Sequence, residues 1–315
     1  MLLYVARRTL EFLLSVVLAS IAVFAFMAVL PGDPAQVALG VNASPEAIAA
    51  TRAQFGTDRP LLTQYIDWVS GLPTGNFGRS YVTKDVIGPQ IVDRLQVTLW
   101  LVVTATVLAL AIAVPFGVVA ALRQRRTSGV VLSGLSQIGI AIPSFLAGIL
   151  LVAFVSVWLG WLPSSGWTPP NQDPVDFARH LVLPVLALAV VQAAVLTRYI
   201  RSSVLDVLRE DFLRTARAKG MRPMAALVRH GFRNAAIPVV TVLGLQLSTL
   251  LIGAVVVERV FVIPGLGSLL LDGTANRDLL LVQGVVMVLV VAVLLVNFMV
   301  DLLYPVIDPR LRRAR

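Results

Sequence analysis

The sequence contains no cysteine and, among 315 residues, only two histidines and two lysines. Without cysteine, neither a disulfide framework nor a cysteine-based metal or redox site can form. An ATP-binding P-loop needs a lysine between glycine and serine or threonine. Lys84 and Lys219 instead follow Thr83 and Ala218, so we do not expect this chain to bind ATP.

Motifs typical of enzymes are also missing. The sequence has no HExxH, GxSxG or GxSG pattern, which excludes the common zinc and serine-nucleophile sites. His180 and His230 are predicted at opposite faces of a membrane, so they cannot share a metal ion. Two carboxylate pairs fall in aqueous loops, where we expect solvation or helix capping: Glu210 with Asp211, and Asp173 with Asp176. We predict that the chain is not an enzyme and holds no metal or cofactor.

Charge is scarce throughout the chain. Charged residues make up 14% of the sequence and hydrophobic residues 57%, whereas about a quarter of the residues in soluble domains are charged. Six charge-free stretches each supply the roughly 18 apolar residues that a membrane-spanning helix needs: 12–30, 95–122, 127–172, 180–197, 234–257 and 279–300. The third is long enough for a helix and a re-entrant loop. We predict an all-α polytopic membrane protein with six transmembrane helices.

The first apolar stretch follows Arg7 and Arg8, as it would in a secretory signal peptide. Its apolar core is longer than that of a typical signal, and no small-x-small cleavage pattern stands directly before Pro31. We therefore expect it to be retained as a helix.

Ionisable residues are predicted only at the ends of the spans, at Glu11, Arg198, Glu258 and Asp301. Carriers driven by ion gradients normally place such residues inside the membrane, where they relay charge. We therefore do not expect ion-coupled transport within this chain.

The net charge of +9 could indicate a nucleic-acid partner, but the position of the charges favours another explanation. If the N-terminus is cytoplasmic, the inside segments hold 18 of the 26 lysines and arginines: 1–10, 123–126, 198–233 and 310–315. The outside segments hold the other 8, with 11 acidic residues. The positive-inside rule then predicts an N-in/C-in topology, and we expect no nucleic-acid partner.

Four parts are predicted along the chain: an N-terminal tip and first span (1–30), an external or periplasmic subdomain (31–93), a core with five spans (94–305) and a cytoplasmic tail (306–315). The subdomain reads as a helix capped by Ser44 and Pro45, a turn at 56–60, an amphipathic helix around 61–69 and a glycine-rich stretch. It is either an ordered loop without a ligand or a contact site for a soluble partner. Prolines within the core spans predict kinks: Pro115, Pro143, Pro184 and Pro238.

The longest cytoplasmic segment, 198–235, predicts two helices. The first covers about 203–219 and has an apolar face: Val204, Leu205, Leu208, Phe212, Leu213 and Ala216. Gly220 ends it, and Pro223 opens the second helix. From composition alone, an amphipathic helix on anionic lipid is an equally good interpretation of this segment.

TARAKG (215–220) followed by RHGFRNAAIP (229–238) resembles the cytoplasmic signature loop of ABC-importer permeases, in the form typical of dipeptide and oligopeptide systems. Arg214 and Thr215 replace the first two residues of the general Glu-Ala-Ala-x3-Gly pattern. The spacing from Gly220 to Pro238 is also longer than in the general consensus of these permeases. Six further blocks resemble these permeases in the same order: PGDP (31–34), DRPLLTQY (58–65), GNFGRS (75–80), IPSF (142–145), ERVFVIPGLG (258–267) and DLLYPVIDPR (301–310).

The resemblance implies the type I ABC importer permease fold and a short coupling helix that fits a groove on an ATPase subunit. The residues that it places at this contact are Arg214, Thr215, Ala216, Lys219, Gly220 and Met221. It also implies a second homologous permease, two ATPase subunits that bind ATP and magnesium, and an extracytoplasmic peptide-binding protein. The resemblance does not identify residues of the substrate path.

The implied function is ATP-driven import of di- and oligopeptides across a bacterial inner membrane by a multi-pass permease in contact with lipid. The same machinery could carry nickel, glutathione or haem. A non-transport membrane scaffold is the alternative from another class.

Overall fold

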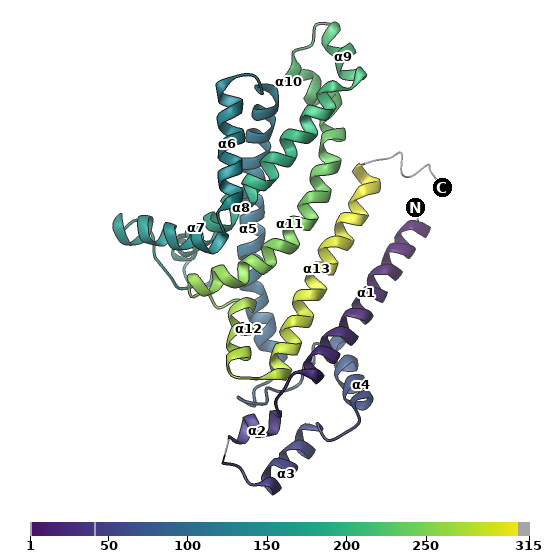
Figure 1. Ribbon diagram of the computed structural model, residues 1–315, viewed down its shortest axis with the longest axis vertical. Helices are drawn as coiled ribbons and strands as arrows, with labels where there is room; N and C mark the ends of the chain where they lie inside the picture. Colours follow the sequence, from purple (N-terminus) through teal and green to yellow (C-terminus); the bar gives the residue numbers. More distant parts are fainter. Residues whose placement is uncertain (1, 41, 308–315) are drawn as a thin grey trace. The chain divides into compact units, whose positions relative to one another are not determined.

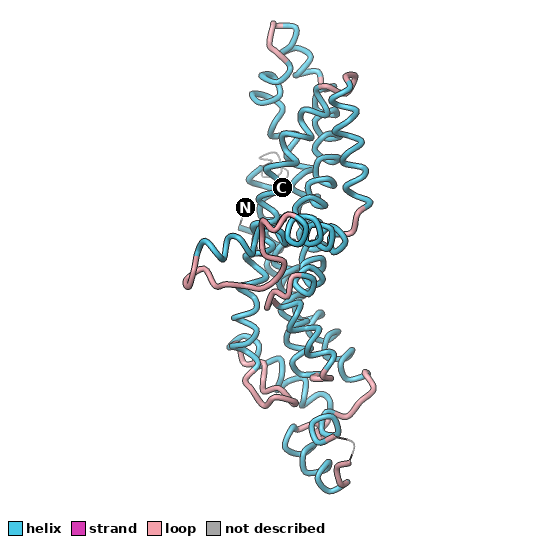
Figure 2. The backbone as a smooth tube through the Cα atoms, turned by 90° about the vertical axis from the view of Figure 1, so that its left-hand side faces the viewer, coloured by secondary structure: helices cyan, strands magenta, loops and turns pink. Residues whose placement is uncertain are grey.

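The computed structural model describes residues 2–40 and 42–307. These residues form helices and loops, with one isolated antiparallel bridge between Arg79 and Val86 (Figure 1, Figure 2). The predicted all-α class is confirmed. The α-helices are α1 (Leu2–Val29), α2 (Pro34–Leu39), α3 (Pro45–Phe55), α4 (Leu61–Gly71), α5 (Ile87–Leu122), α6 (Thr127–Ala141), α7 (Ser144–Leu151), α8 (Pro174–Arg209), α9 (Asp211–Ala218), α10 (Pro223–Ala226), α11 (Phe232–Val260), α12 (Leu266–Ala275) and α13 (Leu279–Ile307). A 3-10 turn covers Leu72–Thr74, and π-helical segments cover Val152–Trp158 and Leu227–Gly231.

Within the described residues, five helical segments are long and apolar enough to cross a membrane: Leu3–Val29, Ile87–Leu122, Pro174–Arg209, Pro223–Val260 and Leu279–Pro305. A sixth arises if Thr127–Ala141 and Ser144–Trp158, which meet at 98°, form one bent span. The bend falls in the stretch where the sequence predicts a helix and a re-entrant loop. With the bent pair included, the six predicted spans are all present.

The second and fourth spans are parts of longer helices. α5 and α8 have 36 residues each, which corresponds to about 54 Å of helix against a hydrocarbon layer of about 30 Å. The charge-free stretch in the fourth span ends at residue 197, whereas the helix itself continues to Arg209. Both helices therefore extend into polar sequence.

The residues divide into two compact units that do not follow the predicted linear boundaries. Unit 1 comprises the described residues of Met1–Arg8, Leu99–Ile263 and Val296–Arg315, and unit 2 comprises those of Thr9–Thr98 and Pro264–Leu295. Most of the predicted tail, at 308–315, lies outside the described residues.

Unit 2 is organised around apolar side chains from distant parts of the chain. One cluster joins the first turns of α5 to α12 and the start of α13: Ile87, Ile91, Leu266, Leu269, Leu281 and Val285 are all buried. Burial of apolar area is the main favourable term in such packing. It explains why 264–295 groups with the external segment rather than with the predicted core.

The external helices begin where the sequence predicts. Pro45 opens α3, and the Ser44 hydroxyl accepts a hydrogen bond from the Ala47 amide at 3.2 Å. Hydrogen bonds from its own backbone amide and from Ser44 lower the pKa of the Glu46 carboxyl. The short helix α2 is an addition to the predicted elements, and Asp33 caps it through the Ala35 amide at 3.0 Å.

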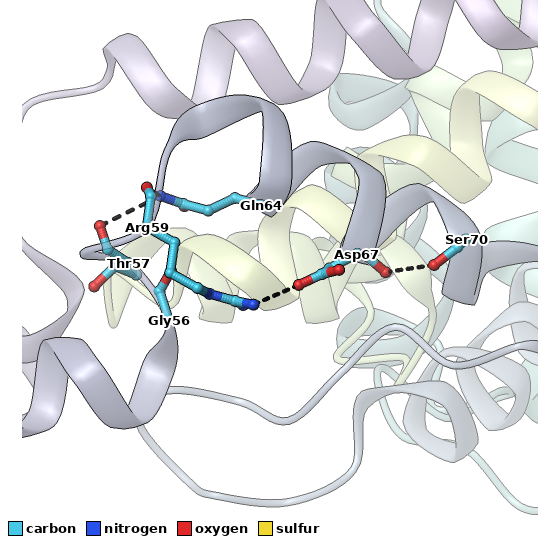
Figure 3. A network of polar contacts seen from close by, with 6 residues as sticks. All are labelled: Gly56, Thr57, Arg59, Gln64, Asp67 and Ser70. Atoms are coloured by element: carbon cyan, nitrogen blue, oxygen red, sulfur yellow. Dashed lines mark hydrogen bonds and ion pairs between the residues drawn. The ribbon is translucent and has the colours of Figure 1, made fainter.

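Polar contacts hold the turn between α3 and α4 (Figure 3). The Gln64 Nε2 donates to the carbonyl oxygens of Arg59 at 2.7 Å and Thr57 at 3.3 Å. Arg59 Nη1 lies 2.7 Å from Asp67 Oδ2, but about half of each side chain is exposed, so this ion pair adds little stability. The amide of Gln64 is therefore the more important contact, because it satisfies two backbone carbonyls.

A buried carboxylate ties the external loop to the end of α12. Asp278 is 2% exposed and accepts hydrogen bonds from the Ser80 hydroxyl and from the amides of Tyr81 at 3.3 Å and Leu281 at 3.4 Å. It therefore caps α13 and fixes the loop at once. Burial, and secondarily the charge of Asp278, raises the pKa of the Tyr81 hydroxyl.

In unit 1, α8 packs against α6, α7 and α11, and Figure 1 shows α7 turning away from the direction of α6. Pro143 lies at this break, so it marks the 98° bend if α6 and the helix that follows form one span, as the sequence predicts. The preceding residue, Ile142, is extended (φ −91°, ψ 119°) because a proline ring clashes with a helical residue before it. The other predicted kink sites do lie inside helices: Pro115 in α5, Pro184 in α8 and Pro238 in α11.

Candidate functional site

The polar segment between α8 and α11 forms a compact group of short helices at one end of unit 1 (Figure 1). The predicted continuous helix over 203–219 is wrong. α8 continues to Arg209, Glu210 is extended (φ −64°, ψ 143°), and α9 then begins at Asp211. The break allows α9 to turn back and pack against the end of α8 and the π-helical turn Leu227–Gly231.

A small apolar core supports α9. Leu213 is fully buried and Ala216 is 8% exposed. A Cβ atom placed on Gly231 would lie 2.9 Å from Val207 Cγ1 and 3.1 Å from Leu213 Cδ1. Glycine at 231 therefore permits the close approach of the π-helical turn to α8 and α9, because any larger residue must displace side chains that are already in contact.

The turn after α9 has the hydrogen bonds of a Schellman motif. The Met221 amide donates to the Ala216 carbonyl at 3.2 Å, and the Gly220 amide donates to the Arg217 carbonyl at 3.0 Å. Gly220 has φ +90°, a conformation that costs glycine little and other residues more. Pro223 opens α10. The predicted stop at Gly220 and start at Pro223 are both confirmed.

The six predicted contact residues divide by exposure. Arg214, Thr215, Lys219 and Gly220 are exposed, Met221 is half-buried, and Ala216 faces the small core. The first four can contact a partner directly, whereas Ala216 can only support the helix. Their role in contact with an ATPase stays a prediction.

Two apolar side chains that the prediction did not place at the contact are exposed on α9 and α10. Phe212 is 39% exposed and Met224 is 50% exposed. The predicted helix over 203–219 placed Phe212 on its apolar face, because the prediction treated these residues as one continuous helix. The break at Glu210 resets the helical phase, so Phe212 lies on the outer side.

The exposed charges of this group are mostly basic. Arg214 Nη1 lies 3.5 Å from Asp211 Oδ1, but the side chains are 72% and 96% exposed, so the pair is weak. Arg209, Arg217, Lys219 and Arg222 are also exposed. The surface is therefore suited to an acidic partner surface, with Phe212 and Met224 as apolar contacts.

Potential metal ligands and the predicted capping carboxylates can be located in the described part of the chain. No three His, Cys, Asp or Glu side chains gather there closely enough to hold a metal ion. Asp173 caps α8 by accepting from the amides of Val175 and Asp176, at 2.9 and 3.0 Å. The capping role predicted for this carboxylate is confirmed.

Two protein-family models match the sequence. Residues 113–313 match the family described as "Binding-protein-dependent transport system inner membrane component". Residues 1–102 match the model of the N-terminal part of such membrane components. Together the two models cover most of the chain.

Curated relatives match over nearly the full length. The "Glutathione transport system permease protein GsiC" of Escherichia coli (strain K12) is 40% identical over 312 residues, which is 99% of each chain. The protein of the same name from Salmonella choleraesuis (strain SC-B67) is also 40% identical, with the same coverage.

Solved structures show a similar fold. A chain of the MetNI methionine ABC transporter in an inward-facing conformation has a TM-score of 0.57 and 19% sequence identity, over 69% of this chain and 96% of that chain. A second crystal form of the same transporter has a TM-score of 0.58. At this identity the likeness concerns the fold alone.

Proposed function

The chain belongs to the family of binding-protein-dependent transport system inner-membrane components, is a multi-pass permease subunit of an ABC importer, and, we propose, conducts peptides. The observation that carries this proposal is the full-length match to permeases named for glutathione, which is itself a tripeptide. The blocks that resemble dipeptide and oligopeptide permeases support the same class of cargo.

In the proposed mechanism, this chain works with a second homologous permease, two ATPase subunits and an extracytoplasmic peptide-binding protein. ATP and magnesium bind to the ATPase subunits, and this chain needs no cofactor. Both termini lie in the cytoplasm, as the distribution of lysine and arginine favours.

The contact with an ATPase subunit is proposed at α9 and the turn after it. Arg214, Thr215, Lys219 and Gly220 offer an exposed surface there, and the proposal adds Phe212 and Met224. The packing of α9 against α8 supports the idea that a push on α9 reaches a membrane-spanning helix directly. In this proposal α9 and α8 move together as one rigid unit.

Uptake by the purified complex tests this function. The complex is isolated through a tag on this chain, reconstituted in liposomes with its binding protein, and supplied with labelled di- and oligopeptides. Uptake that requires both ATP and the binding protein is the expected result. Uptake of glutathione but not of the other peptides would narrow the cargo to glutathione, and ATPase activity with uptake only of nickel or haem would move the cargo to that class. Failure to co-purify with any ATPase would favour a scaffold.

A further inference from the structure

Unit 1 contains an open pocket beside the break between α6 and α7. Its volume is about 390 Å³, within the range of roughly 300–1,000 Å³ that is usual for small-molecule sites. Residues 140–145 line one side, and residues of α8 and α11 line the others. All the lining residues are uncharged, so any selectivity has to come from backbone groups, amides and hydroxyls.

The N-terminus of α7 lies at this pocket. Its first internal hydrogen bond runs from the Ala147 amide to the Pro143 carbonyl at 3.0 Å, and Pro143 provides no side-chain cap. The amides of residues 144–146 therefore precede the helical hydrogen-bond ladder. Such a terminus carries partial positive charge, and transporters use the ends of discontinuous helices to hold anionic groups of a substrate.

A buried polar side chain lines the same pocket independently. Gln192, on α8, is 3% exposed, and neither its amide oxygen nor its amide nitrogen has a hydrogen-bond partner in the described part of the chain. An amide without partners in an apolar interior is unfavourable. The amide oxygen of Gln192 needs a hydrogen-bond donor and its amide nitrogen needs an acceptor. A peptide bond supplies both, through its N–H and its C=O.

Polar groups of the other walls complete the lining. Gln246 and Thr249 lie on α11. On the facing wall, the Ser144 Oγ lies 3.4 Å from the position that a Cβ atom on Gly253 would occupy. A Cβ atom at 253 would therefore be in ordinary van der Waals contact with Ser144, so α7 and α11 lie close together at this point of the lining.

We propose that this pocket binds the carboxylate end of a peptide cargo, with the carboxylate at the N-terminus of α7 and the adjacent peptide bond at Gln192. The inference rests on the proposed function and adds a location in this chain at which cargo is held. The partial positive charge at α7 favours carboxylate-bearing peptides and disfavours a bare cation such as Ni²⁺.

Protection of an introduced thiol tests occupancy directly. Because the chain has no cysteine, Thr249→Cys creates a single thiol in it, and Leu245→Cys provides a control elsewhere on α11, outside the pocket. The whole complex is treated with N-ethylmaleimide in detergent, and alkylation of this chain over time is measured by mass spectrometry. Trialanine and S-methylglutathione are the probes, with trialanine amide and Ni²⁺ as comparisons.

We expect saturating trialanine or S-methylglutathione to slow alkylation of Thr249→Cys about tenfold and to leave Leu245→Cys unchanged. Protection by one of the two peptides alone supports the site and identifies which kind of peptide it takes. Equal protection by trialanine amide would overturn the role of the carboxylate. Protection by Ni²⁺ alone, no protection, or a thiol that is blocked in the complex regardless of peptide would overturn the proposal.

Transport supplies the second readout. Gln192→Leu should reduce peptide uptake about tenfold, the effect of one lost hydrogen bond of ordinary strength, while the ATPase activity stimulated by the binding protein is retained. Gln192→Asn should recover part of the uptake, and Gln137→Leu, an exposed glutamine outside this pocket, should leave it unchanged. Normal uptake by Gln192→Leu in a complex whose wild type imports peptide would overturn this inference alone. Absence of peptide uptake in the wild type would overturn the proposed function instead.

Discussion

The hydroxyl of Ser203 donates a hydrogen bond of 2.8 Å to the carbonyl oxygen of Ala235, 32 positions further along the chain. Ser203 lies on α8 near its end and Ala235 in the first turn of α11, and both are buried. The bond therefore joins α8 to α11 at the two ends of the segment 203–235, which contains α9 and α10. We predict that a displacement of α9 is transmitted through this bond to both membrane-spanning helices.

Replacing Ser203 with alanine should weaken this connection. A buried hydrogen bond contributes about 1 kcal/mol, and the Ala235 carbonyl would lose this partner. We expect several-fold more ATP hydrolysed per peptide imported in proteoliposomes, with normal assembly of the complex. Ser202→Ala is the matched control, because Ser202 is exposed. An unchanged ratio in Ser203→Ala would show that the bond does not transmit the movement.

Replacing Gly220 with valine should uncouple ATP hydrolysis from transport. A β-branched residue at φ +90° is strained by about 1–3 kcal/mol, although a Cβ atom there meets no neighbour within 4 Å. Only the turn is affected, so the spans should remain folded. We expect uptake to fall at least tenfold, with an intermediate value for Gly220→Asn, since asparagine tolerates positive φ better. Normal transport by Gly220→Val would exclude this turn as the coupling contact.

Replacing Gly231 with alanine should push the π-helical turn Leu227–Gly231 away from α8 and α9. The added Cβ would lie 2.9 Å from Val207 Cγ1, so the side chains beneath α9 must move. Such overpacking costs about 1–3 kcal/mol. We expect weaker co-purification of the ATPase subunits and faster hydrogen exchange in α9. Gly134→Ala on α6 is the matched control, because a Cβ there meets nothing within 4 Å. Equal behaviour of the two variants would contradict the role given to this packing.

Ionisation of Tyr81 should occur above the usual tyrosine pKa of about 10, because burial disfavours the phenolate. With a raised folded-state pKa, the stability that Tyr81 contributes is complete below pH 10 and is lost as the pH rises through the folded-state value. Absorbance of tyrosinate in wild type minus Tyr81→Phe should therefore titrate above pH 10, and exchange of the loop amides should quicken over the same interval. A midpoint at or below pH 10 would contradict the burial of this hydroxyl.

Features decided by neighbouring residues could be predicted from the sequence. The apolar stretches predicted the spans, Ser44 and Pro45 predicted the start of α3, and Gly220 predicted the end of α9. Each of these depends on contacts within one or two helical turns, or on solvation of a continuous stretch. Such terms can be evaluated from the order of residues alone.

The remaining features depend on contacts between residues that are far apart in the chain. Asp278 meets Ser80 across 198 positions, and no local pattern marks either residue for the other. The break at Glu210, which places Phe212 on the outer side, occurs where α9 packs on α8, a contact that no local pattern predicts. The pocket that contains Gln192 exists because α6 and α7 separate at Pro143 beside α8 and α11. The sequence alone determined which segments enter the membrane and where short helices begin and end, because solvation and capping are local. Only the tertiary structure decided which faces meet and which polar groups are left without partners, because both depend on long-range packing.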